Sequence, residues 1–403
     1  MGLKIVLITT GQPSCNPRVV KEADTLSAAG HEVTVVYNYF IKWADENDRL
    51  LLADVAWKHY RAGGSPGQNK NRYLFTRIRN KLAIRLSRFS GNGFLMAERA
   101  QARAYDELLS TAKKIKADWY IGHNLGALAV AVNAAVFNKA RVGFDFEDYY
   151  RGENIPGTIK SKRIAWLEQK YLPRVFYYSA ASEMIKNAVQ RDHPGFNGTV
   201  LTLNNCFPLV QQPQFRLKNQ NDNTLQLFWF SQTIGINRGL EVLIEALRLI
   251  NDSNIHLTLA GRCNEDILEY IKSTAADMAA NIHFAGIIPS ADLPAYASQF
   301  DLGMAIEIQE PVNRNICLTN KIFTYLLAGN SIILSETAMQ LAFNTEYKIG
   351  ESFSKGDAAG LAEKINFYRD HEKLNAQKKH NYELAKNQLN WNKEAKKLLA
   401  IIT

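Results

Sequence analysis

The chain has 403 residues, of which 46% are hydrophobic and 22% are charged. This composition is typical of globular proteins and excludes a disordered, collagen-like or coiled-coil chain, and the length favours two domains of roughly 200 residues each. The net charge of +9 is concentrated in residues 1–200, which hold 29 Lys and Arg against 18 Asp and Glu. The basic first half indicates that this part of the chain meets an anionic partner.

The sequence shows no targeting or membrane-spanning signal. No apolar run reaches the ~18 residues that a membrane span needs, and residues 1–10 resemble a first strand rather than a signal peptide. The four cysteines are widely spaced, which indicates neither a disulfide framework nor a zinc site; they are Cys15, Cys206, Cys263 and Cys317. A cytoplasmic protein is therefore expected.

Short apolar runs rich in β-branched residues alternate with helical patterns in the first half. Strands are predicted at residues 4–10, 33–37, 51–60, 118–122, 141–146, 174–180 and 199–203. Helices are predicted at residues 17–29, 73–89, 94–116 and 125–138. This alternation predicts a parallel sheet that is covered by helices on both faces.

A stretch rich in Asn, Gln and Pro at residues 204–224 predicts a linker, after which the alternation restarts. Strands are predicted at residues 225–230, 255–260, 282–285, 302–306 and 331–334. Helices are predicted at residues 239–251, 265–279, 290–299 and 320–328, the third capped by Ser290, and over the remainder of the chain. The predicted fold class is α/β, with two Rossmann-like doubly wound domains that face a central cleft.

Several segments resemble one enzyme family. Residues 10–13 and the phrase AAGHEV at 28–33 resemble the opening of GT-B fold glycosyltransferases of family 4. In the second half, residues 230–241 are similar to the donor-phosphate loop of that family, and NKIFTYLLAG at 320–329 resembles its "NKlfEYlaaG" helix. The resemblance implies an acceptor-binding domain at 1–207, a nucleotide-sugar domain at 208–384, and a terminal helix at 385–403 that crosses back to the first domain.

Two cations lie in the motifs that, by the resemblance, bind the donor diphosphate. The loop from Gly235 to Gly239 opens a helix, and Arg238 in it can grip phosphate oxygens with two N–H groups. Lys321 lies in the first turn of the next motif helix, where a cation opposes the helix dipole and so indicates a nearby anion. The alternatives are a solvated helix-start arginine and a lysine extended into water.

One position departs from the family pattern. Thr324 stands where the family usually has a glutamate that holds the donor ribose, and threonine cannot make that bidentate contact. A second acid usually found about eight residues upstream would fall on Ile316. Glu307 and Glu310 are nearby, but their spacing is wrong.

Polar residues follow two predicted strands of the first half. His123 comes directly after one strand, and the resemblance implies that it lies near the donor sugar and helps transfer. An N-capping or structural histidine is the alternative. Asp145, Glu147 and Asp148 follow the next strand, where acids bind acceptor hydroxyls, act as a base, or merely favour a helix N-terminus.

The resemblance implies a complete set of site residues. Catalytic roles fall on His123, Arg238 and Lys321. Donor binding falls on Gly11, Ser231, Gln232, Gly235, Arg238, Gly261, Ile287, Asn320, Lys321 and Thr324. Acceptor binding falls on Asn16, Arg18, Asp145, Glu147, Asp148 and Arg151. No metal and no cofactor are expected.

The predicted function is transfer of a hexose-type sugar from a nucleotide diphosphate sugar, UDP- or GDP-linked, to a glycan or lipid-linked acceptor. By resemblance the transfer is retaining and metal-independent and serves cell-surface polysaccharide or glycoconjugate synthesis. The alternatives are a sugar-nucleotide epimerase of the same fold and a non-catalytic sugar-binding or scaffold protein. No nucleic-acid partner is expected, because the cations cluster without a recognition motif.

Residues 70–89 predict a basic amphipathic helix. Seven Lys and Arg lie between 70 and 88 without an acid, and Leu74, Ile78, Leu82 and Leu86 recur at four-residue spacing. This pattern suits peripheral contact with an anionic membrane, such as the inner face of the cell membrane. A helix packed on its own domain with a solvated basic face is the alternative.

Overall fold

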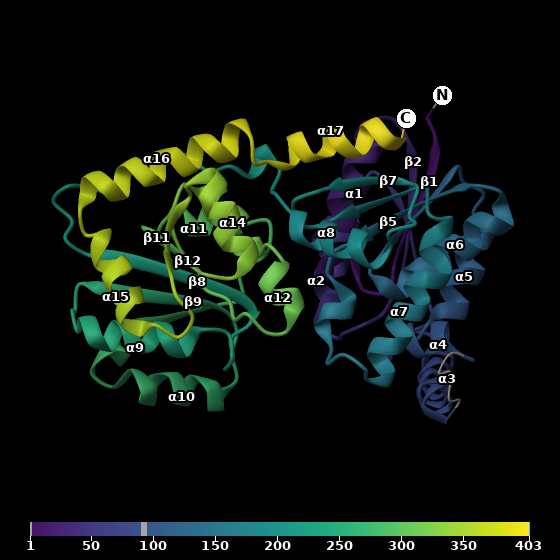
Figure 1. Cartoon of the computed structure of the whole chain (residues 1–403), viewed down its shortest axis with the longest axis horizontal. Coiled ribbons are helices and arrows are strands. Elements are labelled where there is room, and N and C mark those ends of the chain that lie inside the picture. Colours follow the sequence, from purple (N-terminus) through teal and green to yellow (C-terminus); the bar gives the residue numbers. More distant parts are fainter. Residues whose placement is uncertain (1, 90–94, 403) are drawn as a thin grey trace. The chain divides into compact units, whose positions relative to one another are not determined.

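The computed structural model describes residues 2–89 and 95–402, which divide into two compact units (Figure 1). The first unit comprises Met1–Leu203 with Lys397–Thr403, and the second comprises Asn204–Lys396. Each unit holds a parallel sheet covered by helices, so the predicted α/β class with two Rossmann-like domains is confirmed. Among the helices of the described ranges, none is both long and apolar enough to cross a lipid bilayer.

The first unit is built on a seven-stranded parallel sheet of order β3-β2-β1-β4-β5-β6-β7. Its strands are β1 (Lys4–Thr9), β2 (Glu32–Asn38), β3 (Lys58–Ala62), β4 (Trp119–His123), β5 (Arg141–Phe146), β6 (Tyr177–Ala180) and β7 (Thr199–Thr202). Its helices are α1 (Pro17–Ala28), α2 (Ala44–Leu51), α3 (Lys70–Phe89), α4 (Ala97–Gln101), α5 (Tyr105–Lys114), α6 (Leu125–Asn138), α7 (Ile159–Tyr171) and α8 (Glu183–Asp192).

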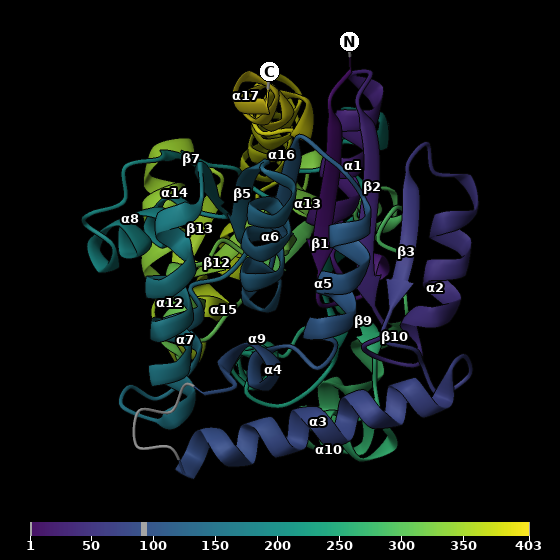
Figure 2. The same cartoon turned by 90° about the vertical axis from the view of Figure 1, so that its right-hand side faces the viewer.

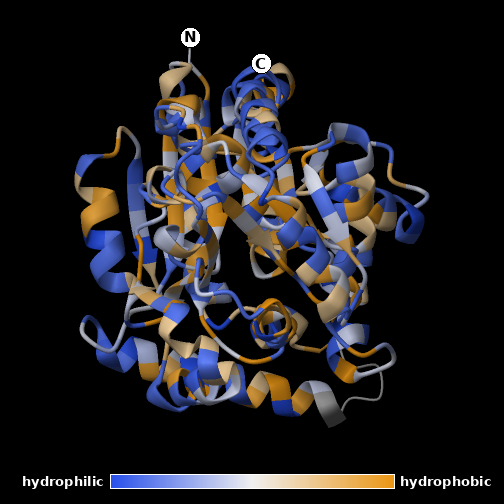
Figure 3. Ribbon diagram, turned by 90° about the vertical axis from the view of Figure 1, so that its left-hand side faces the viewer, coloured by the Kyte–Doolittle hydropathy of each residue, from blue (hydrophilic) through white to orange (hydrophobic). Residues whose placement is uncertain are grey.

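The core of this unit follows from the alternation of side chains along each strand. Ile5 and Leu7 point to the face covered by α1 and by the last turns of α17 (Trp391–Ile402), where Leu398 and Ile402 are fully buried. Helices α5 and α6 pack on the sheet as well, and α6 is alanine-rich and almost entirely buried. In Figure 3 the strands are mainly coloured as hydrophobic, while the outer helices mix both colours.

The second unit is built on a six-stranded parallel sheet of order β10-β9-β8-β11-β12-β13. Its strands are β8 (Leu225–Thr233), β9 (Ile255–Arg262), β10 (Ile282–Gly286), β11 (Leu302–Ala305), β12 (Ser331–Ser335) and β13 (Gly350–Phe353). Its helices are α9 (Leu240–Ile250), α10 (Glu265–Ala275), α11 (Leu293–Ala297), α12 (Val312–Ile316), α13 (Asn320–Ala328), α14 (Ala338–Tyr347), α15 (Ala358–Phe367) and α16 (His371–Asn387). Helices α9, α10 and α15 share one apolar core with the sheet.

Several predicted elements differ from the structure. The strand predicted at 51–60 is wrong over most of its length: Leu51 ends α2, Leu52–Asp54 form a 3-10 helix, and β3 begins only at Lys58. The helix predicted at 94–116 is two helices, α4 and α5, with residue 94 outside the described residues. The helix predicted at 290–299 is only α11, which begins after Asp292 rather than after Ser290. Strand β13 falls where the sequence predicts only helices, and helices α2, α7, α8 and α12 lie where it predicts none.

Candidate functional site

The carboxyl edge of the first sheet gathers charged side chains from distant parts of the chain. Strands β1, β4 and β5 are neighbours, and Thr9, His123 and Asp145 lie at matching register positions near their ends. Helix α1 begins just after the loop that follows β1, with Asn16 as its N-cap accepting a hydrogen bond from the Val19 N–H. Its first turns bring Arg18 and Glu22 to the same edge.

Arg18 and Asp145 form a buried ion pair. The Arg18 Nε and Nη2 atoms each donate to one oxygen of Asp145 at 2.6 Å, and Nη1 donates to the Leu203 carbonyl at 2.7 Å. The Ser179 hydroxyl donates to the same carboxylate at 2.6 Å. Side-chain exposure is 4% for Arg18 and 1% for Asp145, so the pair is shielded from water.

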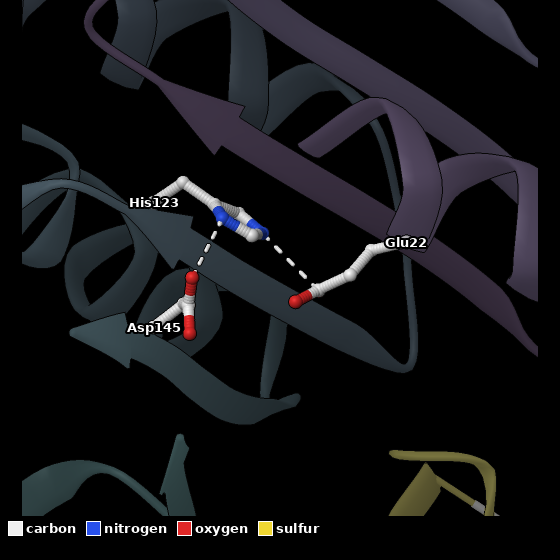
Figure 4. Close-up of side chains that lie close together, drawn as sticks. All are labelled: Glu22, His123 and Asp145. Atoms are coloured by element: carbon white, nitrogen blue, oxygen red, sulfur yellow. Dashed lines mark hydrogen bonds and ion pairs between the residues drawn. The ribbon is translucent and has the colours of Figure 1, made fainter. Parts of the chain in front are cut away.

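His123 is fully buried between carboxylates (Figure 4). Its Nε2 lies 3.2 Å from Glu22, and its Nδ1 lies 3.5 Å from Asp145 and 3.3 Å from Glu147. Glu147 also accepts a hydrogen bond from the Asn16 amide, and with its side chain 18% exposed it is the most accessible of these three carboxylates. The sequence-predicted residues Asn16, Arg18, His123, Asp145 and Glu147 are thus joined in one network.

The network fixes the protonation of its members. Burial by itself would lower the pKa of His123, but the charge of Glu22 and the hydrogen bonds that the ring nitrogens donate to all three carboxylates raise it well above its ordinary value. For Asp145 burial acts in the other direction and favours a higher pKa. The neighbouring Arg18 and His123 outweigh burial and hold the pKa of Asp145 well below its ordinary range. Both ring nitrogens of His123 therefore face carboxylate oxygens, which favour the doubly protonated, cationic form of the ring.

This arrangement predicts a pH-dependent stability. The folded chain keeps a proton on His123 that the unfolded chain releases near pH 6.5. The resulting stabilisation is complete below that pH and is lost as the pH rises through the raised pKa of the folded state. Urea unfolding at pH 6 and pH 9 should therefore give a lower midpoint at pH 9. In His123→Gln this decline should shrink, and an identical decline in both proteins would contradict the assignment.

Among the described residues, one group has the spacing that a metal ion would need. It consists of Glu22, His123 and Asp145, whose potential ligand atoms all lie within 4.8 Å of one another. Both oxygens of Asp145 are already engaged by the Arg18 guanidinium. A cation at this place would meet that fixed positive charge and a protonated imidazole, so an internally paired charge network fits the contacts better.

The other predicted residues of the first unit lie apart from this network. Arg151 donates to Glu168 on α7 at 2.5 Å, and its Nη1 lies 3.6 Å from Asp192 at the end of α8. Asp148 is half-buried in the turn after β5. Gly11 lies in the loop after β1, where its N–H donates to the Thr9 hydroxyl.

The second unit has its own buried ion pair at the carboxyl edge of β11. The Lys321 Nζ lies 2.5 Å from Glu307, with side-chain exposures of 9% and 13%, and it also lies 5.3 Å from the centre of the Trp229 ring on β8. Burial favours a higher pKa for Glu307, but the charge and hydrogen bond of Lys321 outweigh it and keep that pKa below its ordinary value. The anion that the Lys321 position predicts is thus supplied by the protein itself.

The loop before α9 lies beside the same segment. Gly239 has a φ of +82°, and a Cβ there would lie 2.3 Å from Ile306, which explains why a glycine ends the loop. The Arg314 guanidinium donates to the Asn237 carbonyl at 3.4 Å. Arg238 is half-exposed and makes no ion pair with the described residues. The loop therefore keeps one uncommitted cation beside the buried lysine pair.

The remaining predicted donor residues occupy different environments. Thr324 is fully buried, and its hydroxyl donates to the Asn320 carbonyl one turn earlier in α13. Asn320 is the first residue of α13, directly after the N-cap residue Thr319. Ser231 and Gln232 lie in β8, and Gly235 follows that strand. Gly261 packs closely on the Ser231 carbonyl. Ile287 lies beyond β10 and is 57% exposed.

Two residues of the first network escaped the sequence analysis. Glu22 lies four residues after Arg18, so both fall on one face of α1 together with the buried Val19 and Leu26. Two charges on the apolar stripe of a helix are a usable signal of a buried pair. Ser179 offered no such signal, because a serine at a strand end is common.

Comparison with protein-family models and with curated proteins gives no match. Solved structures with similar folds include Anabaena Alr3699/HepE in complex with UDP and glucose, at 14% identity over 99% of both chains with a TM-score of 0.69. Sucrose-phosphate synthase from Thermosynechococcus elongatus shares 12% identity over 99% of this chain and 98% of that chain, with a TM-score of 0.71. The lipopolysaccharide glycosyltransferase WaaG shares 12% over 99% of both chains, with a TM-score of 0.63.

These proteins define the class of fold. The chain has the two-domain, Rossmann-like α/β architecture of the GT-B glycosyltransferases along its whole length. At 12–14% identity the likeness concerns the fold.

Proposed function

We propose that the chain is a glycosyltransferase that uses a nucleotide diphosphate sugar. The observation that carries the proposal is the placement of Arg238 and Lys321 after the adjacent strands β8 and β11, at the carboxyl edge of a doubly wound sheet. Phosphate-bearing ligands bind at this edge of such sheets. The shared fold with HepE, which was crystallised with UDP and glucose, supports the same conclusion.

In the proposed reaction the second unit binds the donor. Arg238 is available to grip the diphosphate with two N–H groups, since the residue is only partly buried and makes no ion pair with the described residues. The proposal also assigns Lys321, whose ammonium group contacts Glu307, to stabilise the leaving diphosphate in place of a divalent ion. A UDP- or GDP-linked hexose is the proposed donor. Thr324 contributes little to it, because its hydroxyl is engaged within α13.

The first unit is proposed to hold a glycan or lipid-linked acceptor. Glu147 and Asp148 are the acids of the predicted set with exposed surface, so they are the proposed contacts to acceptor hydroxyls. His123 is fully buried and reaches the acceptor only through Glu147, which makes it a positioning residue in this proposal. We further propose a retaining transfer that serves polysaccharide or glycoconjugate synthesis.

Release of nucleoside diphosphate tests this function. The purified chain is incubated with a panel of UDP- and GDP-sugars, with and without an extract of glycan and lipid acceptors. Acceptor-dependent release supports the proposal. Conversion of the nucleotide sugar into an isomer without acceptor would replace it with an epimerase. Neither reaction, together with a shift in melting temperature by a sugar nucleotide, would identify a non-catalytic binding protein.

Arg238→Ala should lower turnover by about 10²–10³-fold, the usual loss on removing a donor that stabilises developing negative charge. Its melting temperature should stay close to that of the parent chain, because Arg238 makes no ion pair with the described residues. Arg248→Ala on α9, which removes an exposed pair with Glu245, is the matched control and should keep full turnover. Unchanged turnover in Arg238→Ala would refute the role of this residue.

A further inference from the structure

Helix α3 turns its apolar side chains away from its own unit. Five large hydrophobic residues along it are between 42% and 67% exposed: Leu74, Phe75, Ile78, Leu82 and Leu86. Four of them recur every four residues and therefore form one stripe along the helix. A stripe of this kind is normally buried, and exposed apolar surface in a continuous patch usually marks an interaction site.

The opposite face of α3 holds the helix in place through small and polar residues. Thr76 and Ala83 are fully buried there. The Arg79 guanidinium donates to Glu107 on α5 at 2.5 Å and also lies 3.0 Å from Asp106. The Asn80 amide donates to the Arg99 carbonyl at 2.6 Å. These contacts fix the rotation of the helix, so the apolar stripe faces outward in the folded unit.

Positive charges border the exposed stripe on both sides. On an ideal helix with about 100° per residue, Lys81 lies at one edge of the stripe and Arg72 lies beyond the other. Arg85 falls within the stripe, between the directions of Leu74 and Ile78. Lys70 and Arg77 extend the first edge toward the start of the helix. All five cations are exposed and make no ion pair with the described residues. No acid lies between residues 70 and 88 to neutralise them.

We propose that α3 docks the first unit onto an anionic phospholipid surface, lying flat with its apolar stripe in the headgroup–acyl boundary. The stripe supplies apolar burial, and the flanking Lys and Arg side chains reach the phosphates while their methylene stems stay in the apolar layer. Each basic residue near such a surface strengthens binding about fivefold. A nucleic acid would match the cations but leave the five apolar side chains in water, so the lipid surface fits both features.

The position of α3 relates this surface to the acceptor. The helix begins shortly after β3, and Tyr73 packs edge-on against Tyr39, which follows β2. Figure 2 shows α3 crossing beyond the carboxyl ends of the strands. His123 and Glu147 lie at this same edge of the sheet. Membrane docking stands without the proposed function; if that function holds, it favours a lipid-linked acceptor that stays in the membrane.

Co-sedimentation of the purified full chain with lipid vesicles tests the proposal. Vesicles of equal parts phosphatidylglycerol and phosphatidylcholine should bind the chain, and pure phosphatidylcholine vesicles should bind it at least about tenfold less. Ile78→Ser combined with Leu82→Ser should weaken binding to the anionic vesicles by at least about tenfold. Lys81→Gln combined with Arg85→Gln should do the same, and 0.5 M salt should abolish the difference between the two vesicle types.

Leu217→Ser combined with Leu249→Ser is the matched control. These residues lie in the second unit and are 61% and 55% exposed, close to the 67% and 52% of Ile78 and Leu82. The control should bind vesicles like the parent chain. Equal loss in control and test variants, equal binding to both vesicle types, or binding to single-stranded RNA that displaces the vesicles would overturn the proposal. So would a lipid-free dimer in light scattering that Ile78→Ser with Leu82→Ser dissociates.

Discussion

Asp145→Asn is expected to lower the free energy of unfolding of the first unit by about 3–5 kcal/mol, the usual cost of leaving one partner of a buried ion pair uncompensated. Asp145 accepts from Arg18, Ser179 and His123, and both members of the Arg18 pair are almost fully shielded from water. The asparagine keeps the shape but loses the charge that offsets the burial of Arg18. Urea unfolding of the full chain, followed by circular dichroism, measures the effect.

Two further variants separate charge from shape in this test. Glu32→Gln breaks an exposed ion pair with Lys58 on the same sheet and should leave the urea midpoint almost unchanged. Arg18→Met combined with Asp145→Leu removes both charges and should recover much of the stability that Asp145→Asn loses. A loss below about 1 kcal/mol in Asp145→Asn, the size expected of an exposed pair, would contradict the buried network.

The strands and helices that the sequence predicts well share a local cause. The strand at 141–146 and the helices at 125–138 and 320–328 have the predicted bounds in the structure, because an apolar run or a helical pattern ends there at a clear boundary residue. Lys139 and Gly329 at the two helix ends adopt the left-handed conformation that stops a helix. Strand β13 was missed, because its sequence Gly-Glu-Ser-Phe carries almost no β signal.

The sequence predicts which charged residues belong to the candidate site, but not which of them pair with one another. The position of His123, Asp145 and Glu147 at the carboxyl ends of neighbouring strands follows from the alternating pattern. Their partners do not, since Arg18 and Asp145 are 127 residues apart. The same holds for Lys321: its unfavourable place in the first turn of α13 predicts an anion, but only the folded chain shows that Glu307, which follows β11, provides it. Pairing of this kind depends on sheet order, which no local pattern encodes.

Single and double variants of the Lys321–Glu307 pair separate the contribution of Lys321 to stability from its proposed contribution to turnover. Lys321→Met and Glu307→Gln should each lower the free energy of unfolding by about 3 kcal/mol, because each leaves one buried group unpaired. The double variant should regain most of that stability. Its turnover should nevertheless stay at least about 100-fold below the parent, as in Lys321→Met, because the charge that stabilises the leaving diphosphate is absent from both.

A second buried pair in the same unit serves as the control for this cycle. Lys218 lies 3.0 Å from Asp301, with exposures of 5% and 6%, and Asp301 precedes β11 at the opposite edge of the sheet. Lys218→Met should therefore lower stability too, by less than Lys321→Met because the Lys378 Nζ still lies 3.7 Å from Asp301, but leave the turnover of the folded protein at the parent level. If the Lys321→Met and Glu307→Gln double variant regained turnover together with stability, Lys321 would act only as the counterion of Glu307. The diphosphate would then be held by Arg238 and the backbone of the loop that carries it, without a second cation.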